Sequence, residues 1–212
     1  MSDGIIQNID RSAYYKIISG MSNYRIDNFI REAEAKEGSN KGVVLGFVRG
    51  LRLSSLLIYA IRQLLHGCGL TANWGHIIDA NNEYCSRECD IIIHNENIPL
   101  RQWNGDGGGS HIMDFRFIPF DAAKVVISCK SFLTTSAIEE EYCNDMLKYV
   151  GRVWLFAECC GPKSDEKIEE RATTIGYENF WYLYKWNKAK NELIQTIEVW
   201  DSFVAEILKL RT

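Results

Sequence analysis

The sequence predicts an α/β protein in which a central mixed β-sheet is flanked by helices. Two observations carry this prediction: apolar, turn-bounded segments alternate with segments of helical periodicity, and no Pro-rich or low-complexity linker divides the 212 residues. A hydrophobic content of 46% is enough to bury one full-sized core. We therefore expect a single domain over 1–212, with an N-terminal helical extension at 1–40, a core at 41–160 and a C-terminal strand and helices at 161–212.

The first third of the chain is predicted to be helical. Residues 10–37 follow a helical pattern in one or two pieces, broken near Gly20 and ended by a Gly-Ser-Asn turn signal. A leucine-rich helix is expected over 43–65, and its only charged residues are arginines, among them Arg49 and Arg52, about one turn apart. These two arginines could grip phosphate, although arginine on such a helix is more often a surface residue with its stem over apolar neighbours.

Five apolar segments are expected to form the strands of one mixed sheet, with a glycine-rich loop at 96–111 between the second and the third. This loop lacks the lysine and the strand-to-helix setting of a phosphate-binding loop, so we expect a flexible connection. The five strands are predicted at 73–79, 88–95, 112–118, 124–130 and 152–157. The remaining elements are helices at 136–150, 165–174 and 199–210 and an aromatic strand at 180–186.

Composition limits the function. A formal net charge of −4 and a pI of about 5.6 argue against a protein that coats nucleic acid nonspecifically, while a local basic face remains compatible with them. The seven cysteines are odd in number and form no CxxC pair, which favours reduced thiols. The N-terminal residues lack a signal-peptide pattern, and the longest apolar run, near 53–61, is too short to span a bilayer. We expect a soluble, cytoplasmic protein without a membrane partner.

Side-chain alternation along two predicted strands gathers charge on one face. On 88–95, Glu88 and Asp90 point the same way, and Cys89 points the other way; on 124–130, Ser128 and Lys130 share a face. If these strands meet through the intervening strand, an acid and a lysine lie together at one end of the sheet. A lysine would then end an apolar strand because a site lies there. The alternative is a strand-end lysine that is only solvated and keeps the edge from pairing.

At these residues the chain resembles the PD-(D/E)xK nuclease-like superfamily. The segments ECDIIIHN and VVISCKSF are similar to its two core strands, the first carrying an acid and the second an acid, any residue and a lysine. Within the superfamily the chain is most similar to uncharacterised bacterial domains with an S-x-x-x-D strand, here Ser86 to Asp90, and a V-x-x-x-K-S strand, here Val126 to Ser131. The resemblance covers roughly residues 40–157 and implies a restriction-endonuclease-like core.

The resemblance implies a Mg²⁺-dependent endonuclease that hydrolyses DNA in restriction or phage defence. Asp90 would be the metal-binding acid, and Lys130 the lysine that orients or deprotonates the attacking water. Ser128 stands where the superfamily usually has an acid, and its S-x-K variants take the missing acid from the following helix. Related domains also place a glutamate on the helix before the first strand, and residues 41–67 contain none.

Two residues are candidates for the missing acid. Glu88 lies two residues from Asp90, and Glu139 falls within the apolar arc of the helix predicted at 136–150. A charge in such an arc needs a cationic partner, which a metal or Lys130 could supply. Glu139 is explained equally well as a first-turn acid that the helix dipole favours.

Phosphodiester hydrolysis accounts for these residue types, because Mg²⁺, or Mn²⁺ in its place, is held by hard oxygen ligands and activates water. The predicted site therefore has three sets of residues. The catalytic set is Asp90, Ser128, Lys130 and Glu139, the metal set is Asp90, Glu88 and Glu139, and the nucleic-acid-binding set is Arg49 and Arg52. The alternatives are a nuclease fold that has lost catalysis and binds nucleic acid or protein, and an unrelated α/β interaction domain. A homodimer or a partner subunit is compatible with each of these functions.

Overall fold

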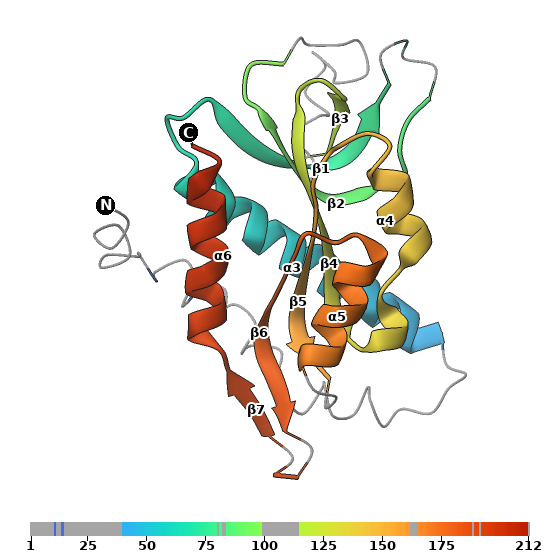
Figure 1. Cartoon of the computed structure of the whole chain (residues 1–212), viewed down its shortest axis with the longest axis vertical. Helices are drawn as coiled ribbons and strands as arrows, with labels where there is room; N and C mark the ends of the chain where they lie inside the picture. The colour runs from blue at the N-terminus through green and yellow to red at the C-terminus, as the bar shows by residue number, and fades with distance from the viewer. Residues whose placement is uncertain are drawn as a thin grey trace.

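The computed structural model describes residues 11, 14, 40–79, 81, 84–98, 115–161, 165–187, 189–190 and 192–211, and its elements are numbered as in Figure 1. In this part of the chain, seven strands form one sheet in the order β3-β1-β2-β4-β5-β6-β7. Four α-helices flank the sheet. The predicted α/β fold with a central mixed sheet is thereby confirmed.

The sheet combines antiparallel and parallel pairs. The antiparallel neighbours on one side are β1 (Leu70–Ile78), β2 (Cys89–Asn95) and β4 (Ala123–Leu133). The parallel neighbours of β4 are β5 (Val153–Cys160) and then β6 (Asn179–Asn187). At the two edges, β3 (Phe115–Pro119) runs parallel to β1 and β7 (Glu192–Gln195) runs antiparallel to β6.

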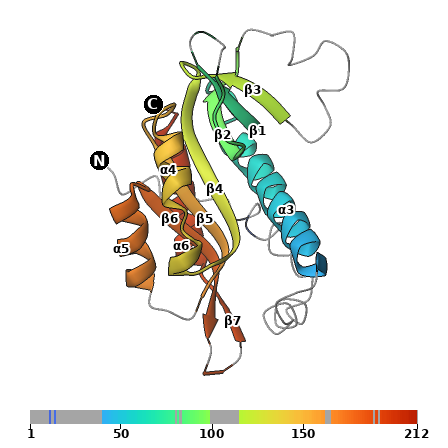
Figure 2. The same cartoon turned by 90° about the vertical axis from the view of Figure 1, so that its right-hand side faces the viewer.

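Helices cover both faces of the sheet, as Figures 1 and 2 show from two sides. One face carries α3 (Asn40–Leu64) and α6 (Ile197–Lys209), and the other carries α4 (Glu140–Met146) and α5 (Asp165–Ile175). The core beneath α3 and α6 includes a cluster of aromatic rings in mutual contact: Trp154, Phe156, Trp181, Trp200 and Phe203. Each face therefore has its own apolar core, and the sheet separates the two.

Two further features concern the helices and the cysteines. Among the helices of the described ranges, none has the length and apolar character that crossing a membrane requires. All seven cysteines carry free thiols, as the sequence predicts.

Three expectations about the elements are corrected by the structure. β4 does not end at Lys130 but continues to Leu133, because Phe132 and Leu133 pair with Cys159 and Cys160 of β5. The helix expected at 136–150 is a 3₁₀ turn at Thr135–Ala137 followed by the short α4. β3 does not lie between β2 and β4, which pair directly; it pairs with β1 at the edge instead.

The other predicted elements either match the structure or fall outside the described residues. The helix expected at 43–65 and the aromatic strand expected at 180–186 appear as α3 and β6, while β7 was not foreseen. Apart from 11 and 14, the helix predicted at 10–37 lies outside the described residues, and so does the loop at 96–111 beyond residue 98.

Candidate active site

Asp90 lies where β2 and β4 stop pairing. The last paired residues are Ile91 and Ile127, one position beyond Asp90 along β2. There the Asp90 carboxylate takes the place of a strand partner, because its Oδ2 accepts the backbone N–H of Cys129 at 2.7 Å. The acid of one core strand is therefore bonded to the backbone of the other, one residue before Lys130.

A β-bulge sets the direction of the residues around Asp90. Between paired positions, β1 advances two residues from Asn73 to Gly75, while β2 moves three residues from Ile92 to Cys89. The alternation expected from the sequence is broken by this extra residue. Cys89 consequently packs in the same core as Ile92, under α4, and not with Ile91 on the other face as predicted.

On β4 the predicted alternation holds. The Cys129 thiol turns toward α3, where it is hydrogen-bonded to Ser54, so it lies on the opposite face from α4. Burial raises the pKa of this thiol well above its usual range, which keeps it protonated. Cys129 is therefore an inert core residue, and the chemistry-bearing side chain of this stretch is Lys130.

The Asp90 side chain is half-buried, and the pKa of its carboxyl is raised from 3.8 to about 6. Burial is the main cause, because it disfavours the ionised form. The Cys129 N–H and the Lys130 ammonium act in the opposite direction, while the negative charges of Glu88 and Glu139 raise the pKa further. Asp90 therefore lies within the electrostatic field of each predicted charged partner.

Lys130 and Glu139 form an ion pair between Nζ and Oε1. Glu139 occupies the N-cap position of α4 in an extended conformation and makes no side-chain capping hydrogen bond there. Its side chain is 52% exposed. The prediction that Glu139 points into an apolar helical arc is therefore wrong, because the helix begins only after it. The prediction of a cationic partner is met by Lys130.

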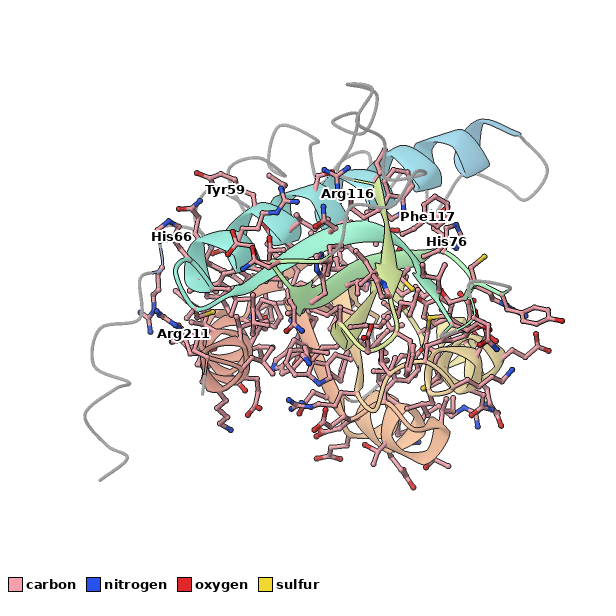
Figure 3. All side chains as sticks on the ribbon, turned by 90° about the horizontal axis from the view of Figure 1, so that it is seen from above. Tyr59, His66, His76, Arg116, Phe117 and Arg211 are labelled. Carbon is pink, nitrogen blue, oxygen red and sulfur yellow. The ribbon has the colours of Figure 1, made fainter. Side chains whose placement is uncertain are left out.

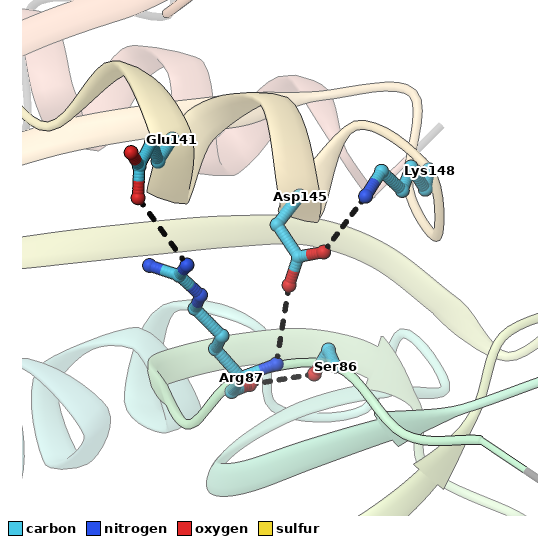
Figure 4. A network of polar contacts seen from close by, with 5 residues as sticks. All are labelled: Ser86, Arg87, Glu141, Asp145 and Lys148. Atoms are coloured by element: carbon cyan, nitrogen blue, oxygen red, sulfur yellow. Dashed lines mark hydrogen bonds and ion pairs between the residues drawn. The ribbon is translucent and has the colours of Figure 1, made fainter.

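The backbone preceding β2 is tied to α4 by a polar network, shown in Figure 4. The Arg87 N–H donates to Asp145 Oδ2 at 3.3 Å, and the Arg87 guanidinium lies 3.5 Å from Glu141 Oε2. Lys148 holds the other oxygen of Asp145 at 3.1 Å. These contacts are mostly exposed, so each is expected to contribute little to stability or to the position of α4.

The remaining predicted site residues are Ser128, Glu88, Arg49 and Arg52. Ser128 is buried, with 1% exposure, and its hydroxyl is hydrogen-bonded to Tyr177. Glu88 is exposed immediately before β2. Arg49 and Arg52 belong to α3, on the face opposite α4, and their side chains lie outside the described part of the structure. Their predicted contact with phosphate stays a prediction.

Two tyrosines near Asp90 were missed by the sequence analysis. The Tyr142 hydroxyl is buried near Cys89 and Asp90 and makes no hydrogen bond to oxygen or nitrogen among the described residues. Tyr177 donates its hydroxyl to the backbone oxygen of Glu139 at 3.3 Å. Nothing in the sequence indicates that either tyrosine lies near the site, because a tyrosine in an apolar periodic segment is usually an ordinary core residue.

The oxygen atoms near Asp90 are of the type that a hard divalent cation binds. Carboxylate oxygens of Asp90, Glu139 and Glu88 are ligands that Mg²⁺ and Mn²⁺ accept, and a metal-bound water would give the Tyr142 hydroxyl a partner. Within the residues that the structure describes, however, no three His, Cys, Asp or Glu side chains stand close enough to hold a metal ion. Glu139 is engaged with Lys130, so binding of a metal by both acids requires Glu139 to leave the lysine.

The order of the strands, together with the likeness to solved structures, defines a restriction-endonuclease-like α/β fold. Two solved structures share this fold at low sequence identity. The cAAA-bound form of NucC from E. coli MS115-1 has a TM-score of 0.51 and 8% identity, covering 97% of this chain and 92% of that one. The cAAA-bound form of NucC from P. aeruginosa ATCC27853 has a TM-score of 0.50 and 9% identity, covering 76% and 77%. No family model and no curated protein sequence matches the chain.

Proposed function

We propose that the protein is a metal-dependent endonuclease that cleaves DNA, of the phage-defence or restriction kind. The observation that carries the proposal is the Lys130–Glu139 ion pair, whose two charges both act on the Asp90 carboxyl at the point where β2 and β4 stop pairing. The NucC structures that share the fold belong to a phage-defence endonuclease of the PD-(D/E)xK type, which supports the same class here. DNA in the cytoplasm is then the substrate, and a homodimer or partner subunit would bring two sites to its two strands.

The roles follow from the chemistry of each group. Asp90 would hold Mg²⁺ or Mn²⁺ together with Glu139, and Glu88 is the further acid within reach of the same field. The bound metal supplies an activated water and stabilises charge on the phosphate. Lys130 would position that water and lend positive charge to the transition state, once Glu139 has turned from its ammonium to the metal. Arg49 and Arg52 remain proposed phosphate contacts.

A nuclease-fold module without catalysis is the second candidate. It is favoured by one observation, the absence among the described residues of a preassembled three-ligand metal cluster. Ser128 in place of an acid points the same way, since the hydroxyl is buried and bonded to Tyr177. Such a module would bind nucleic acid or protein through the same surface without cleaving it.

Plasmid cleavage separates the two candidates. The wild type should nick and linearise supercoiled DNA with Mg²⁺ or Mn²⁺, and Asp90→Asn and Lys130→Met should each lose roughly 100-fold or more in rate. Lys148→Met is the matched control, because Lys148 is an exposed lysine just beyond the end of α4 that pairs with Asp145. Metal-independent binding of duplex DNA without any cleavage would support the inactive module. A protein that neither cleaves nor binds DNA would contradict the nuclease and the DNA-binding form of the module, and would leave only a module that binds protein.

A further inference from the structure

Tyr177 connects two predicted site residues that are far apart in the sequence. Its hydroxyl donates to the backbone oxygen of Glu139 at 3.3 Å and is hydrogen-bonded to the Ser128 side chain. Because the tyrosine proton goes to a carbonyl oxygen, the Ser128 hydroxyl must be the donor in the second bond. The result is a bridge from β4 through Tyr177 to the residue that begins α4.

The bridge is buried at Tyr177 and Ser128, and its third point is the backbone of the exposed Glu139. Tyr177 is 2% exposed and Ser128 is 1% exposed. Tyr177 is aimed by the turn that ends α5, where Gly176 adopts a φ of 116° and the Tyr177 N–H returns to Ala172 O at 3.0 Å. The Glu139 oxygen also accepts the Cys143 N–H at 3.2 Å, the first hydrogen bond of α4. Tyr177 therefore holds the start of α4 against the sheet.

This position matters because, among the described residues, the Lys130 ammonium is the one ion-pair partner of the Glu139 side chain. Its side chain is half exposed and makes no capping hydrogen bond to the described helix. An exposed ion pair alone fixes geometry weakly, since side-chain entropy and solvent screening oppose it. A backbone anchored by a buried hydroxyl restricts where the carboxylate can go.

We infer that Tyr177 is a positioning residue, which uses Ser128 to place Glu139 beside Lys130 and Asp90. The inference rests on the proposed function, in which Glu139 supplies an acid to the metal. The inference also explains Ser128 at the position where an acid is expected. Its hydroxyl supports Tyr177, and Glu139 supplies the negative charge. Ser128 then acts without touching a metal.

The test combines Mn²⁺ titration calorimetry with amide hydrogen exchange on the full chain. Tyr177→Phe removes only the hydroxyl, so the Mn²⁺ dissociation constant should rise about fivefold, as expected for one lost hydrogen bond. The amides of Cys143 and Leu147, which bond within α4, should exchange faster by a similar factor. Ser128→Ala should act in the same direction and add little to Tyr177→Phe, because both remove one bridge.

Thr196→Val is the matched control, because Thr196 also donates a hydroxyl to a backbone oxygen, that of Tyr182 at 2.8 Å, at the start of α6. It should lower stability without changing Mn²⁺ affinity or exchange in α4. Wild-type Mn²⁺ binding with an unchanged affinity in Tyr177→Phe would overturn the inference. Absence of Mn²⁺ binding in the wild type would overturn the proposed function instead. The exchange of α4 would then decide the bridge alone, and unchanged exchange in Tyr177→Phe would refute it.

Discussion

At the scale of single residues, the site consists of two acids in different environments. Asp90 is half-buried, bonded to the backbone of β4, and has a pKa raised to about 6, whereas Glu139 is exposed and paired with a lysine. A half-buried acid of this kind costs stability, which is common for residues kept for function. Glu139 costs little, because its charge is solvated and compensated.

Glu139→Gln tests this difference. Because the ion pair with Lys130 is partly exposed, we expect the free energy of unfolding to change by less than about 1 kcal/mol. The affinity for Mn²⁺, measured by calorimetry, should fall roughly tenfold or more, since a carboxylate ligand becomes an amide. Glu141→Gln is the control: Glu141 is 87% exposed, pairs with Arg87, and should leave Mn²⁺ affinity unchanged. Equal affinities for wild type and Glu139→Gln would assign the acid to Glu88 or to no residue.

At the scale of elements, the pairing of the edge strand β3 with β1 depends on a glycine. Gly75 of β1 has a φ of 153°, and a Cβ there would lie 1.7 Å from the backbone oxygen of Arg116 in β3. Gly75 is also paired with Cys89, at the bulge beside Asp90. One residue therefore allows β3 to approach β1 and the bulge to form.

Gly75→Ala should destabilise the protein by about 3 kcal/mol or more, because the backbone of β3 has to move away. Gly151→Ala is the control, since a Cβ at Gly151 meets nothing within 4 Å; it should change stability by about 0.5 kcal/mol or less. Urea denaturation of the three proteins makes the comparison. A Gly75→Ala variant as stable as the Gly151→Ala variant would show that the close approach is not required.

The sequence predicted the strands better than their details. The runs around Ile92 and Val126 are apolar enough to define β2 and β4, and alternation placed Cys129 and Lys130 on the correct faces. The bulge at β2 could not be predicted, because it depends on how β1 pairs with β2 and not on local composition. Glu139 was misplaced because a helical wheel assumes an unbroken helix. The hydrogen bond from Tyr177 to the Glu139 backbone joins residues 38 positions apart, so no local sequence pattern could predict it.

At the scale of the whole molecule, two buried groups give opposite pH dependences. Burial lowers the pKa of His94 to about 4, so the stability that it contributes is present above about pH 6.5 and is lost as the pH falls toward 4. The raised pKa of Asp90 acts in the opposite sense: its contribution is present below about pH 3.8 and is lost as the pH rises toward 6. Across this window the two effects largely cancel.

Asp90→Asn should remove the pH-dependent contribution of Asp90 and leave that of His94. The wild type is expected to vary little in unfolding free energy between pH 6.5 and 4, while Asp90→Asn should lose about 3 kcal/mol over the same range, from the shift of His94 alone. At pH 7.5 the variant should be about 2 kcal/mol more stable than the wild type, because a buried charge is gone. Urea denaturation at several pH values checks both. In His94→Asn only the contribution of Asp90 remains, so the unfolding free energy should rise as the pH falls from 6.5 to 4. Parallel plots of unfolding free energy against pH for all three proteins would contradict these expectations.

We propose that Asp90 and Glu139 together form a metal site on this fold, and diffraction from crystals soaked in Mn²⁺ is the sharpest test of this proposal. We expect an anomalous peak between the two carboxylates, with Glu139 turned away from Lys130, and no such peak in Asp90→Asn crystals under the same soak. A wild-type crystal that keeps the Lys130–Glu139 ion pair and shows no anomalous peak at Asp90 would contradict it.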